Sequence, residues 1–361
     1  MVLTNSHTAR DMSEKKVLVV LGVTGTQGGA VLRYLVRHEP NTFTLRGITR
    51  NPASQASRDV QALGVDIVKA DNDNLASLKA ALSGATHVFA NTDSNQHIFY
   101  AMKYPEVLDS RQTPLTYARD IEMQQGRNIV KALAATESLE RVVWSTLASP
   151  AKWSKGKYTN VTMFDAKGAI GDLFWSEEKL KGKVSMVIVG FYLTNALKMP
   201  ELQAPKKVSL FALDMTMGRC TNHQRQQPDG VFELALLSSG DVPYPHVDVD
   251  ADLGSWVSAL FEAEAGITLV GASEMLTWRE WLQLWADRNG VQARYRWAPV
   301  DESATAIFKA VQEEFQFVEE YGLAGGNPEA IYPEELRNRG IKIFTSPVAE
   351  GMQRIDWSSI L

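Results

Sequence analysis

The chain has 361 residues with a net charge of −5, and 45% of them are hydrophobic and 22% charged. This composition is too apolar for extensive disorder, and the length favours a large domain that carries a smaller one. The acidic balance argues against a direct nucleic-acid partner, because phosphate binding needs a concentrated basic face. The single cysteine, Cys220, excludes an intrachain disulfide, and since no His/Cys cluster has zinc spacing we expect no metal.

The first residues of the chain show no targeting segment. Residues 1–14, MVLTNSHTARDMSE, lack the apolar core of a secretory signal and are expected to be a disordered tail. No apolar run approaches the roughly 20 residues that cross a bilayer. We therefore expect a cytoplasmic protein, possibly also nuclear, without a membrane partner. The sequence carries no signal for the oligomeric state.

The first half of the chain alternates apolar runs of strand length with amphipathic stretches of helix length, which predicts a doubly wound parallel α/β sheet. The predicted strands are residues 17–22, 42–49, 65–69, 87–91, 141–145 and 184–190. The predicted helices are residues 27–37, 54–63, 74–82, 115–135 and 164–179. The connection at 93–114 is longer than usual, so we expect a flap over the site there.

A glycine-rich stretch, LGVTGTQGG at 21–29, joins the first predicted strand to the first helix. Its spacing puts Gly22 in a tight turn, Gly25 where the backbone approaches a pyrophosphate, and Gly28 where the helix packs on the strand. The free N–H groups at the helix start would face the phosphates. This strand–turn–helix context predicts dinucleotide binding.

The end of the second predicted strand, GITRNP at 47–52, bears on the choice of cofactor. Folds selective for NAD carry an acidic residue there, and this chain has Arg50. A guanidinium suits a 2′-phosphate through bidentate, charge-assisted hydrogen bonds. NADP is therefore favoured, and NAD is the alternative.

These motifs, together with VKADNDNLASLKAALSGATHVFANT, VVWSTL and MFDAKGAIGDLF, resemble the NmrA-like family of atypical short-chain dehydrogenases/reductases over residues 15–195. The ending IDWSSIL is similar to fungal members. The resemblance implies a Rossmann-type sheet with a smaller α/β lobe and a cleft between them. It implies that the cofactor is bound by Gly22, Thr24, Gly25, Thr26, Gln27, Gly28, Arg50, Asp71, Asn72, Thr92 and Lys167. Some members add a second phosphate contact through a lysine where this chain has Ser54, so the selectivity for NADP over NAD stays open.

The second half of the chain loses the regular alternation after Gly190, and prolines punctuate it. We assign residues 15–199 to the Rossmann-type domain, with 246–272 rejoining it through a helix and a strand at 267–270. Residues 200–245 and 273–361 are assigned to the smaller lobe, for a substrate or a partner. Within it, TWREWLQLWADRNG predicts a helix with a buried tryptophan face.

The reaction centre departs from the usual pattern of the fold. Carbonyl reduction uses a tyrosine that donates a proton and a lysine four residues later. Lys167 has the lysine position, but Met163 stands where the tyrosine belongs. Lys167 and Tyr192 are the candidate catalytic residues, and Tyr158 would reach the site only if its loop folds inward.

The remaining candidates come from two strand ends. Ser145 or Thr146 could fill the place of the serine that accompanies the tyrosine, or satisfy the strand end instead. In GFYLTNAL, the residues Phe191, Tyr192 and Asn195 are the candidate substrate contacts.

Two functions follow from these residues. We favour an NAD(P)(H)-dependent oxidoreductase that acts on a small aromatic or polyketide-like metabolite, in a fungal secondary-metabolite pathway. The alternative is a non-catalytic redox sensor of the nitrogen-metabolite-repression type, which acts through a regulatory protein partner. Met163 supports the alternative, while Lys167 and the intact glycine turn support the enzyme.

Overall fold

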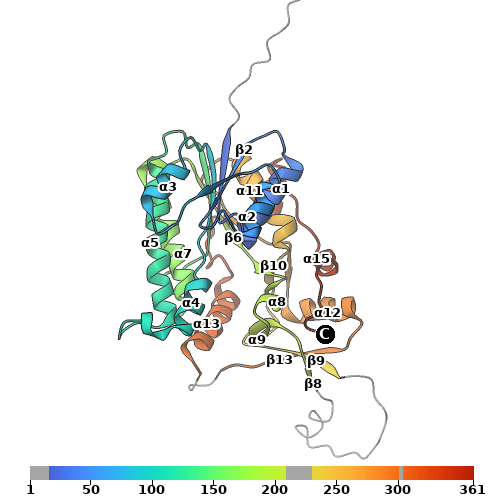
Figure 1. Cartoon of the computed structure of the whole chain (residues 1–361). Helices are drawn as coiled ribbons and strands as arrows, with labels where there is room; N and C mark the ends of the chain where they lie inside the picture. The colour runs from blue at the N-terminus through green and yellow to red at the C-terminus, as the bar shows by residue number, and fades with distance from the viewer. Residues whose placement is uncertain (1–15, 209–229, 301–303) are drawn as a thin grey trace, which may run out of the picture.

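The computed structural model of the chain describes residues 16–208, 230–300 and 304–361. The predicted tail at 1–14 and Cys220 lie outside these ranges. In the described part, a large sheet with helices on both faces stands beside two smaller sheets (Figure 1).

The large sheet has eight strands in the order β14-β11-β6-β5-β4-β1-β2-β3, and all its pairs are parallel. The strands are β1 (Val17–Leu21), β2 (Thr44–Thr49), β3 (Asp66–Lys69), β4 (His87–Ala90), β5 (Arg141–Thr146), β6 (Val184–Val189), β11 (Thr268–Gly271) and β14 (Ala330–Ile331). The predicted Rossmann-type α/β fold is confirmed, because the chain returns from β3 to place β4 beside β1.

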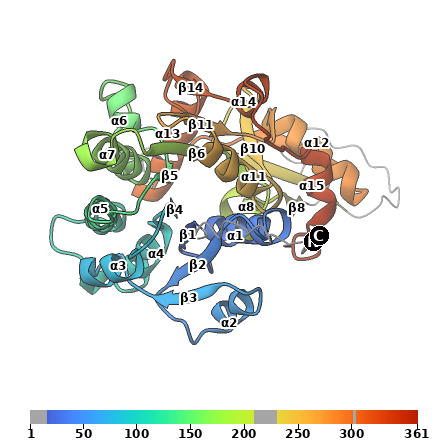
Figure 2. The same ribbon diagram turned by 90° about the horizontal axis from the view of Figure 1, so that it is seen from above.

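Helices cover both faces of this sheet, as Figure 2 shows. The helices of the first half are α1 (Thr26–His38), α2 (Gln55–Gln61), α3 (Leu75–Ala81), α5 (Pro114–Ala134) and α7 (Thr162–Ser176). In β1, Leu18 and Val20 join the core beneath α1 and α11 (Val249–Glu262), whereas Val19 and Leu21 join the core beneath α3, α5 and α7. Side chains of a strand alternate between its faces, so a strand buried on both faces reads as one continuous apolar run.

Residues 93–114 form a helix and not the expected flap. They fold into α4 (Asn95–Lys103) and a short 3₁₀ turn, η1 (Pro105–Val107). Ile98 and Ala101 are buried, but Phe99 and Met102 on the other side are exposed. Apolar residues on all sides of the helix hid its amphipathic period from the sequence pattern.

The end of α7 also differs from the prediction. The helix stops at Ser176, three residues before the predicted end at residue 179. Glu177 leaves the helical conformation, and its side chain caps the following turn, η2 (Glu178–Leu180), by accepting from the Lys179 N–H. A carboxylate that caps a new turn ends the preceding helix.

The strand predicted at 267–270 is confirmed as β11, which pairs with β6 and returns the chain to the large sheet after α11. Residues 273–361 were assigned to the smaller lobe, but β14 within them pairs with β11 at the edge of the large sheet. The helix α14 (Pro333–Asn338) follows it, and Leu336 joins the core beneath α1 and α11. A strand of two residues leaves no readable pattern.

The two smaller sheets form the rest of the molecule. One joins β12 (Glu274–Leu276), β10 (Tyr244–Val247) and β7 (Phe191–Tyr192), and the other joins β13 (Ala293–Trp297), β9 (Val231–Leu236) and β8 (Lys206–Val208). The remaining α-helices of the described residues are α6 (Pro150–Trp153), α8 (Asn195–Lys198), α9 (Pro200–Gln203), α12 (Trp278–Asn289), α13 (Ala306–Tyr321) and α15 (Val348–Arg354). The predicted tryptophan face is confirmed, since Trp278, Trp281 and Trp285 of α12 are buried.

Candidate active site

The residues singled out from the sequence gather at one edge of the large sheet. Parallel strands end at the same edge, and ligands of open α/β sheets bind outside the carboxyl ends of the strands. The glycine turn follows β1, Arg50 follows β2, and Thr92 follows β4. Asp71 and Asn72 follow β3, and Tyr192 lies in β7 directly after β6. The fold brings these residues to the carboxyl edge of the large sheet. Their roles in binding stay predictions.

The glycine turn has the geometry that a dinucleotide requires. Gly22 has a φ of +63°, and the Gly25 N–H donates to the Gly22 carbonyl over 2.8 Å, which closes the turn. A Cβ at Gly28 would lie 2.5 Å from the Gly22 carbonyl oxygen and 2.7 Å from that of Leu21. Glycine is therefore required at position 28 for α1 to begin so close to β1.

The start of α1 is open to an anion. Its N-cap, Gly25, has no side chain, and the first turn contains no acidic residue. In the described residues, the N–H groups of Thr26, Gln27 and Gly28 donate to no other group. Lys198 of α8 adds a positive charge there by donating to Thr26 Oγ1 over 2.6 Å. These donors fit a pyrophosphate. No sequence pattern pointed to Lys198, because it is 172 residues away from Thr26 along the chain.

Gln27 links the glycine turn to β7. Its Nε2 donates to the Tyr192 hydroxyl over 2.6 Å, and its Oε1 is buried without a hydrogen-bond partner in the described ranges. Burial raises the pKa of Tyr192 above its usual value, and the Gln27 hydrogen bond only partly opposes this. A raised pKa makes this hydroxyl a weaker proton donor than an ordinary tyrosine.

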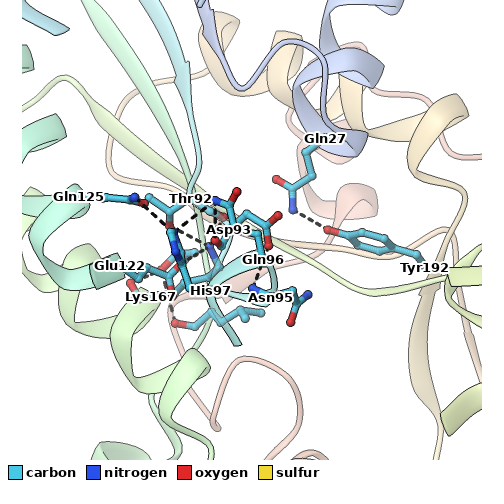
Figure 3. A network of polar contacts seen from close by, with 12 residues as sticks. Gln27, Thr92, Asp93, Asn95, Gln96, His97, Glu122, Gln125, Lys167 and Tyr192 are labelled. Atoms are coloured by element: carbon cyan, nitrogen blue, oxygen red, sulfur yellow. Dashed lines mark hydrogen bonds and ion pairs between the residues drawn. The ribbon is translucent and has the colours of Figure 1, made fainter. Parts of the chain in front are cut away.

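Lys167 lies inside a polar cluster on the other side of the view in Figure 3. Its Nζ donates to the Thr92 carbonyl over 2.8 Å and to Thr92 Oγ1 over 3.1 Å. It also forms an ion pair with Glu122 of α5, at 3.0 Å from Oε1. The exposed side-chain fraction is 14% for Lys167 and 0% for Glu122. The lysine is thus a buried cation with a fully buried counter-charge.

Glu122 is a site residue that sequence reasoning missed. Its Oε1 also accepts from the Thr92 hydroxyl over 2.6 Å, while its Oε2 is buried without a partner in the described chain. Position 122 falls on the buried face of α5, where a charged residue is rare unless it is paired. An acidic residue on the buried face of a predicted helix was the signal that could have found it.

The positions around Lys167 offer no tyrosine. Met163, one turn earlier on α7, is partly buried and packs against apolar neighbours. Thr146 Oγ1 donates to the Lys167 carbonyl over 3.0 Å, so its hydroxyl supports the helix backbone. Ser145 is buried in β5 with 2% of its surface exposed.

Tyr158 points away from this cluster. Its hydroxyl donates to Glu320 of α13 over 2.8 Å, and its ring packs against Phe317 and Tyr321. An open depression of about 530 Å³ lies here, lined by Lys157, Tyr158, Glu313, Gln316, Glu319 and Glu320. Tyr158 therefore contributes to the packing of α13 and not to the chemistry at Lys167.

Arg50 contacts the helix that replaced the expected flap. Its Nη2 donates to Gln96 Oε1 of α4 over 2.7 Å. Burial lowers the pKa of the neighbouring His97, whose Nε2 lies 3.4 Å from an amide nitrogen of Gln96 and also of Gln125. Ser54, in place of a lysine, caps α2 by accepting from the Ser57 N–H over 3.2 Å.

The predicted substrate residues differ in their surroundings. Phe191 is 6% exposed and packs in an aromatic cluster with Tyr244, Trp278 and Phe315. Its ring thus serves the core of the second half of the chain. Asn195 is partly buried at the start of α8, three residues beyond the end of the site strand β7.

The fold and the glycine turn define a Rossmann-type α/β protein. The chain belongs to the NmrA-like family, whose model matches residues 14–358.

Curated relatives are fungal proteins. The chain is 30% identical to the NmrA-like family domain-containing oxidoreductase cpsB of Aspergillus campestris over 147 residues, which are 41% of this chain and 38% of the relative. It is 25% identical over 314 residues to the oxidoreductase ptmS of Penicillium ochrochloron, covering 85% of this chain and 84% of the relative. The match to the first two relatives, cpsB and lnbB, thus spans 38% of their length.

Solved structures share the fold. The structure of NmrA, a negative transcriptional regulator, in complex with NADP has a TM-score of 0.67 and 15% identity, over 96% of this chain and 97% of that one. Isoflavone reductase has a TM-score of 0.61 and 13% identity, over 94% of this chain and 99% of that one. At these identities the comparison speaks for the fold alone.

Proposed function

We propose that the protein is an NAD(P)H-dependent oxidoreductase that acts on a small aromatic or polyketide-like metabolite in a fungal biosynthetic pathway. The observation that carries the proposal is the buried Lys167, held by Glu122 and Thr92 at the sheet edge that also bears the glycine turn. A buried charge at a strand end is costly, and functional sites are where proteins tolerate that cost. The fungal relatives named as oxidoreductases support the same conclusion.

The residues at this edge fit a nicotinamide dinucleotide. The open N–H groups at the start of α1 and Lys198 would hold the pyrophosphate, and Arg50 would hold a 2′-phosphate, which favours NADP over NAD. Lys167 would hold the ribose next to the nicotinamide. A bound nicotinamide supplies the hydride. Glu122 would fix the position of the lysine, because its buried carboxylate provides the counter-charge of the ammonium.

Met163 favours a second candidate function, a sensor that binds the dinucleotide without turning it over and acts through a protein partner. A thioether has no proton to donate, so the usual acid of the fold is missing. The two functions differ in what they demand of the cofactor: an enzyme oxidises NADPH, whereas a sensor distinguishes NADPH from NADP⁺ by affinity.

The test combines turnover with calorimetry. We expect the purified protein to oxidise NADPH with 1,4-naphthoquinone or 2-cyclohexen-1-one, and Lys167→Ala to abolish this oxidation. Titration with all four nicotinamide forms should give tighter binding of NADP(H) than of NAD(H). Binding of NADPH without any turnover, with a preference of tenfold or more for one redox form, would instead establish the sensor; tenfold is about 1.4 kcal/mol.

None of the helices in the described ranges is long and apolar enough to cross a membrane.

A further inference from the structure

Two apolar clusters meet at Met163. One contains Ile98, Leu115, Ala118 and Ala310, and the other is the large aromatic core that includes Phe164, Phe191, Phe315 and Phe317. Met163 packs against both clusters. Helix α13 also contributes to both, with Ala310 in the first and Phe315, Phe317 and Val318 in the second. The face of α13 that carries these residues therefore belongs to the same two clusters as Met163, which stands where the tyrosine of the fold is missing.

Glu314 stands on that face of α13. Residues four apart lie one above another on a helix, so Glu314 is in line with Ala310 and Val318, which are 2% exposed each. Its neighbour Glu313 is turned to another side, because its Oε2 accepts from the N–H groups of Thr159 and Asn160 over 2.9 and 2.8 Å. Among the acidic residues of α13, Glu314 alone occupies the centre of the apolar face.

The Glu314 carboxyl has no polar partner among the described residues. It makes no hydrogen bond or ion pair there, whereas Glu313, Glu319 and Glu320 each accept hydrogen bonds. Burial alone raises its pKa to about 7. The residue Glu314 nevertheless keeps part of its surface accessible. A carboxyl with such a pKa is protonated in about half of the molecules near pH 7, and these retain a proton to donate.

No charged group on the neighbouring elements contributes to this shift. Among the ionisable side chains of α4, α5, α6 and α7, six have other contacts: His97 near Gln125, Lys103 over the Tyr104 ring, Arg119 with Asp120, Lys152 with Asp172, Asp165 with Ser149, and Lys167 with Glu122. On α13 itself, Glu313, Glu319 and Glu320 are turned toward hydrogen-bond partners.

We propose that Glu314 is the acid of the reaction and delivers the proton that the missing tyrosine delivers elsewhere in this fold. The inference rests on the proposed function, and an enone or quinone carbonyl represents the group reduced in the step and in its test. When hydride from NADPH adds to the carbon framework, the electron pair of the carbonyl π system moves to the oxygen. The Glu314 O–H bond breaks, its proton goes to that oxygen, and the carboxylate left behind regains a proton from water.

The other hydroxyls near the site are less suited to this step. Burial raises the pKa of Tyr192 from an already high value, and the Tyr158 hydroxyl is engaged by Glu320. An acid works best when its pKa lies near the pH of operation. Glu314 meets this condition.

The experiment compares Glu314→Gln with Glu313→Gln, two isosteric changes at adjacent positions of α13. Infrared difference titration of the protein without substrate, from about pH 5 to about pH 9, should show a protonated-carboxyl band that disappears near pH 7. The loss of the band near pH 7 should be absent in Glu314→Gln, which keeps only the loss near pH 6 from Asp252, whose pKa burial raises to about 6, and Glu313→Gln should show both. This readout requires no turnover.

The second readout uses NADPH with 2-cyclohexen-1-one or 1,4-naphthoquinone. We expect Glu314→Gln to lower kcat by about 10²-fold, as for the loss of a general acid, with little change in KM and without the fall in rate above pH 7. Glu313→Gln should keep the wild-type rate and pH profile. A Glu314→Gln variant with both unchanged, or a wild-type protein without the loss of the infrared band near pH 7, would overturn the inference. A wild-type protein that oxidises NADPH with neither probe would refute the proposed function instead.

Discussion

Glu122 provides a buried counter-charge for Lys167. The carboxylate accepts from both the ammonium and the Thr92 hydroxyl, and neither lysine nor glutamate has much access to water. The mutual attraction of two such charges offsets the cost of removing them from water only while both are present. The pair is therefore a fixed feature of the site, which holds one amine at one place.

Removing one partner of this pair should clearly lower the free energy of unfolding. We predict that Glu122→Gln lowers the free energy of unfolding by about 3 kcal/mol, because the Lys167 charge is left buried without compensation. The matched control is Asp172→Asn, which breaks the pair between Lys152 of α6 and Asp172 of α7, where both side chains are more than half exposed. That change should cost at most about 1 kcal/mol. Urea unfolding measures both, and equal effects would show that the Glu122 pair is not buried in solution.

Arg50 should determine the preference for NADP over NAD if it binds the 2′-phosphate as we expect. Arg50→Ala should weaken the binding of NADP⁺ by about tenfold to a hundredfold, since a charge-assisted pair with the 2′-phosphate is lost, and should leave NAD⁺ binding unchanged. Arg58→Ala, a change at an exposed arginine of α2, is the control. Calorimetric titration gives the dissociation constants, and an equal loss of affinity for both nucleotides would place Arg50 elsewhere in the site.

At the scale of the element, the glycine turn offers a sharp comparison between neighbours. A Cβ at Gly28 meets backbone carbonyls at 2.5 and 2.7 Å, which cannot move without separating α1 from β1. The nearest atom to a Cβ at Gly29 is Nη1 of the flexible Arg33 side chain, at 2.9 Å. The nearest backbone atom is the Val23 carbonyl oxygen at 3.4 Å, which is an ordinary contact distance.

We predict that Gly28→Ala abolishes dinucleotide binding and costs about 1–3 kcal/mol of stability, the usual penalty for overpacking. Gly29→Ala should bind normally with unchanged or slightly higher stability, because alanine favours the helix. Thermal unfolding and calorimetry compare the two variants. A Gly28→Ala protein that binds NADP(H) as the wild type does would mean that α1 can shift freely against the sheet.

The strands, the glycine turn and most helices were predictable because each leaves a local pattern in the sequence. The strands of the first half could be recognised because strands such as β1 are buried on both faces and therefore form continuous apolar runs in the sequence. Contacts between distant positions were not predictable: Glu122 meets Lys167, and Lys198 meets Thr26, only after the chain has folded. Helix α4 was missed because its apolar residues surround it, and β14 because two residues form no pattern.

At the scale of the whole molecule, the pH dependence of stability involves a buried histidine. It lies in the small sheet of β12, β10 and β7 and contacts the aromatic core. His246 of β10 is 1% exposed, lies 4.8 Å from the Trp278 ring, and has a buried Nε2 without a partner in the described residues. Burial lowers its pKa to about 3. The unfolded chain therefore binds a proton at His246 between about pH 6.5 and pH 3 where the folded protein does not, so the stability falls as the pH falls through this window.

We predict that His246→Leu flattens this dependence by up to about 1.4 kcal/mol per pH unit, the slope for one proton. His87, whose pKa burial lowers to about 4, acts in the same direction and leaves a residual slope. His38→Gln, at an exposed position, is the control. Urea unfolding at a series of pH values between about 6.5 and 4 measures the slope, and the expectation fails if His246→Leu and wild type lose stability in parallel.

The most direct test of the oxidoreductase function follows the hydride itself. The protein is incubated with an enone or quinone and with NADPH deuterated at one of the two C4 positions, and the recovered product is examined by mass spectrometry. We predict that deuterium appears in the product from one of the two labelled cofactors only, and that Lys167→Ala gives no labelled product. A protein that binds NADPH but transfers label from neither position would contradict the proposal, and would leave the role of a dinucleotide sensor.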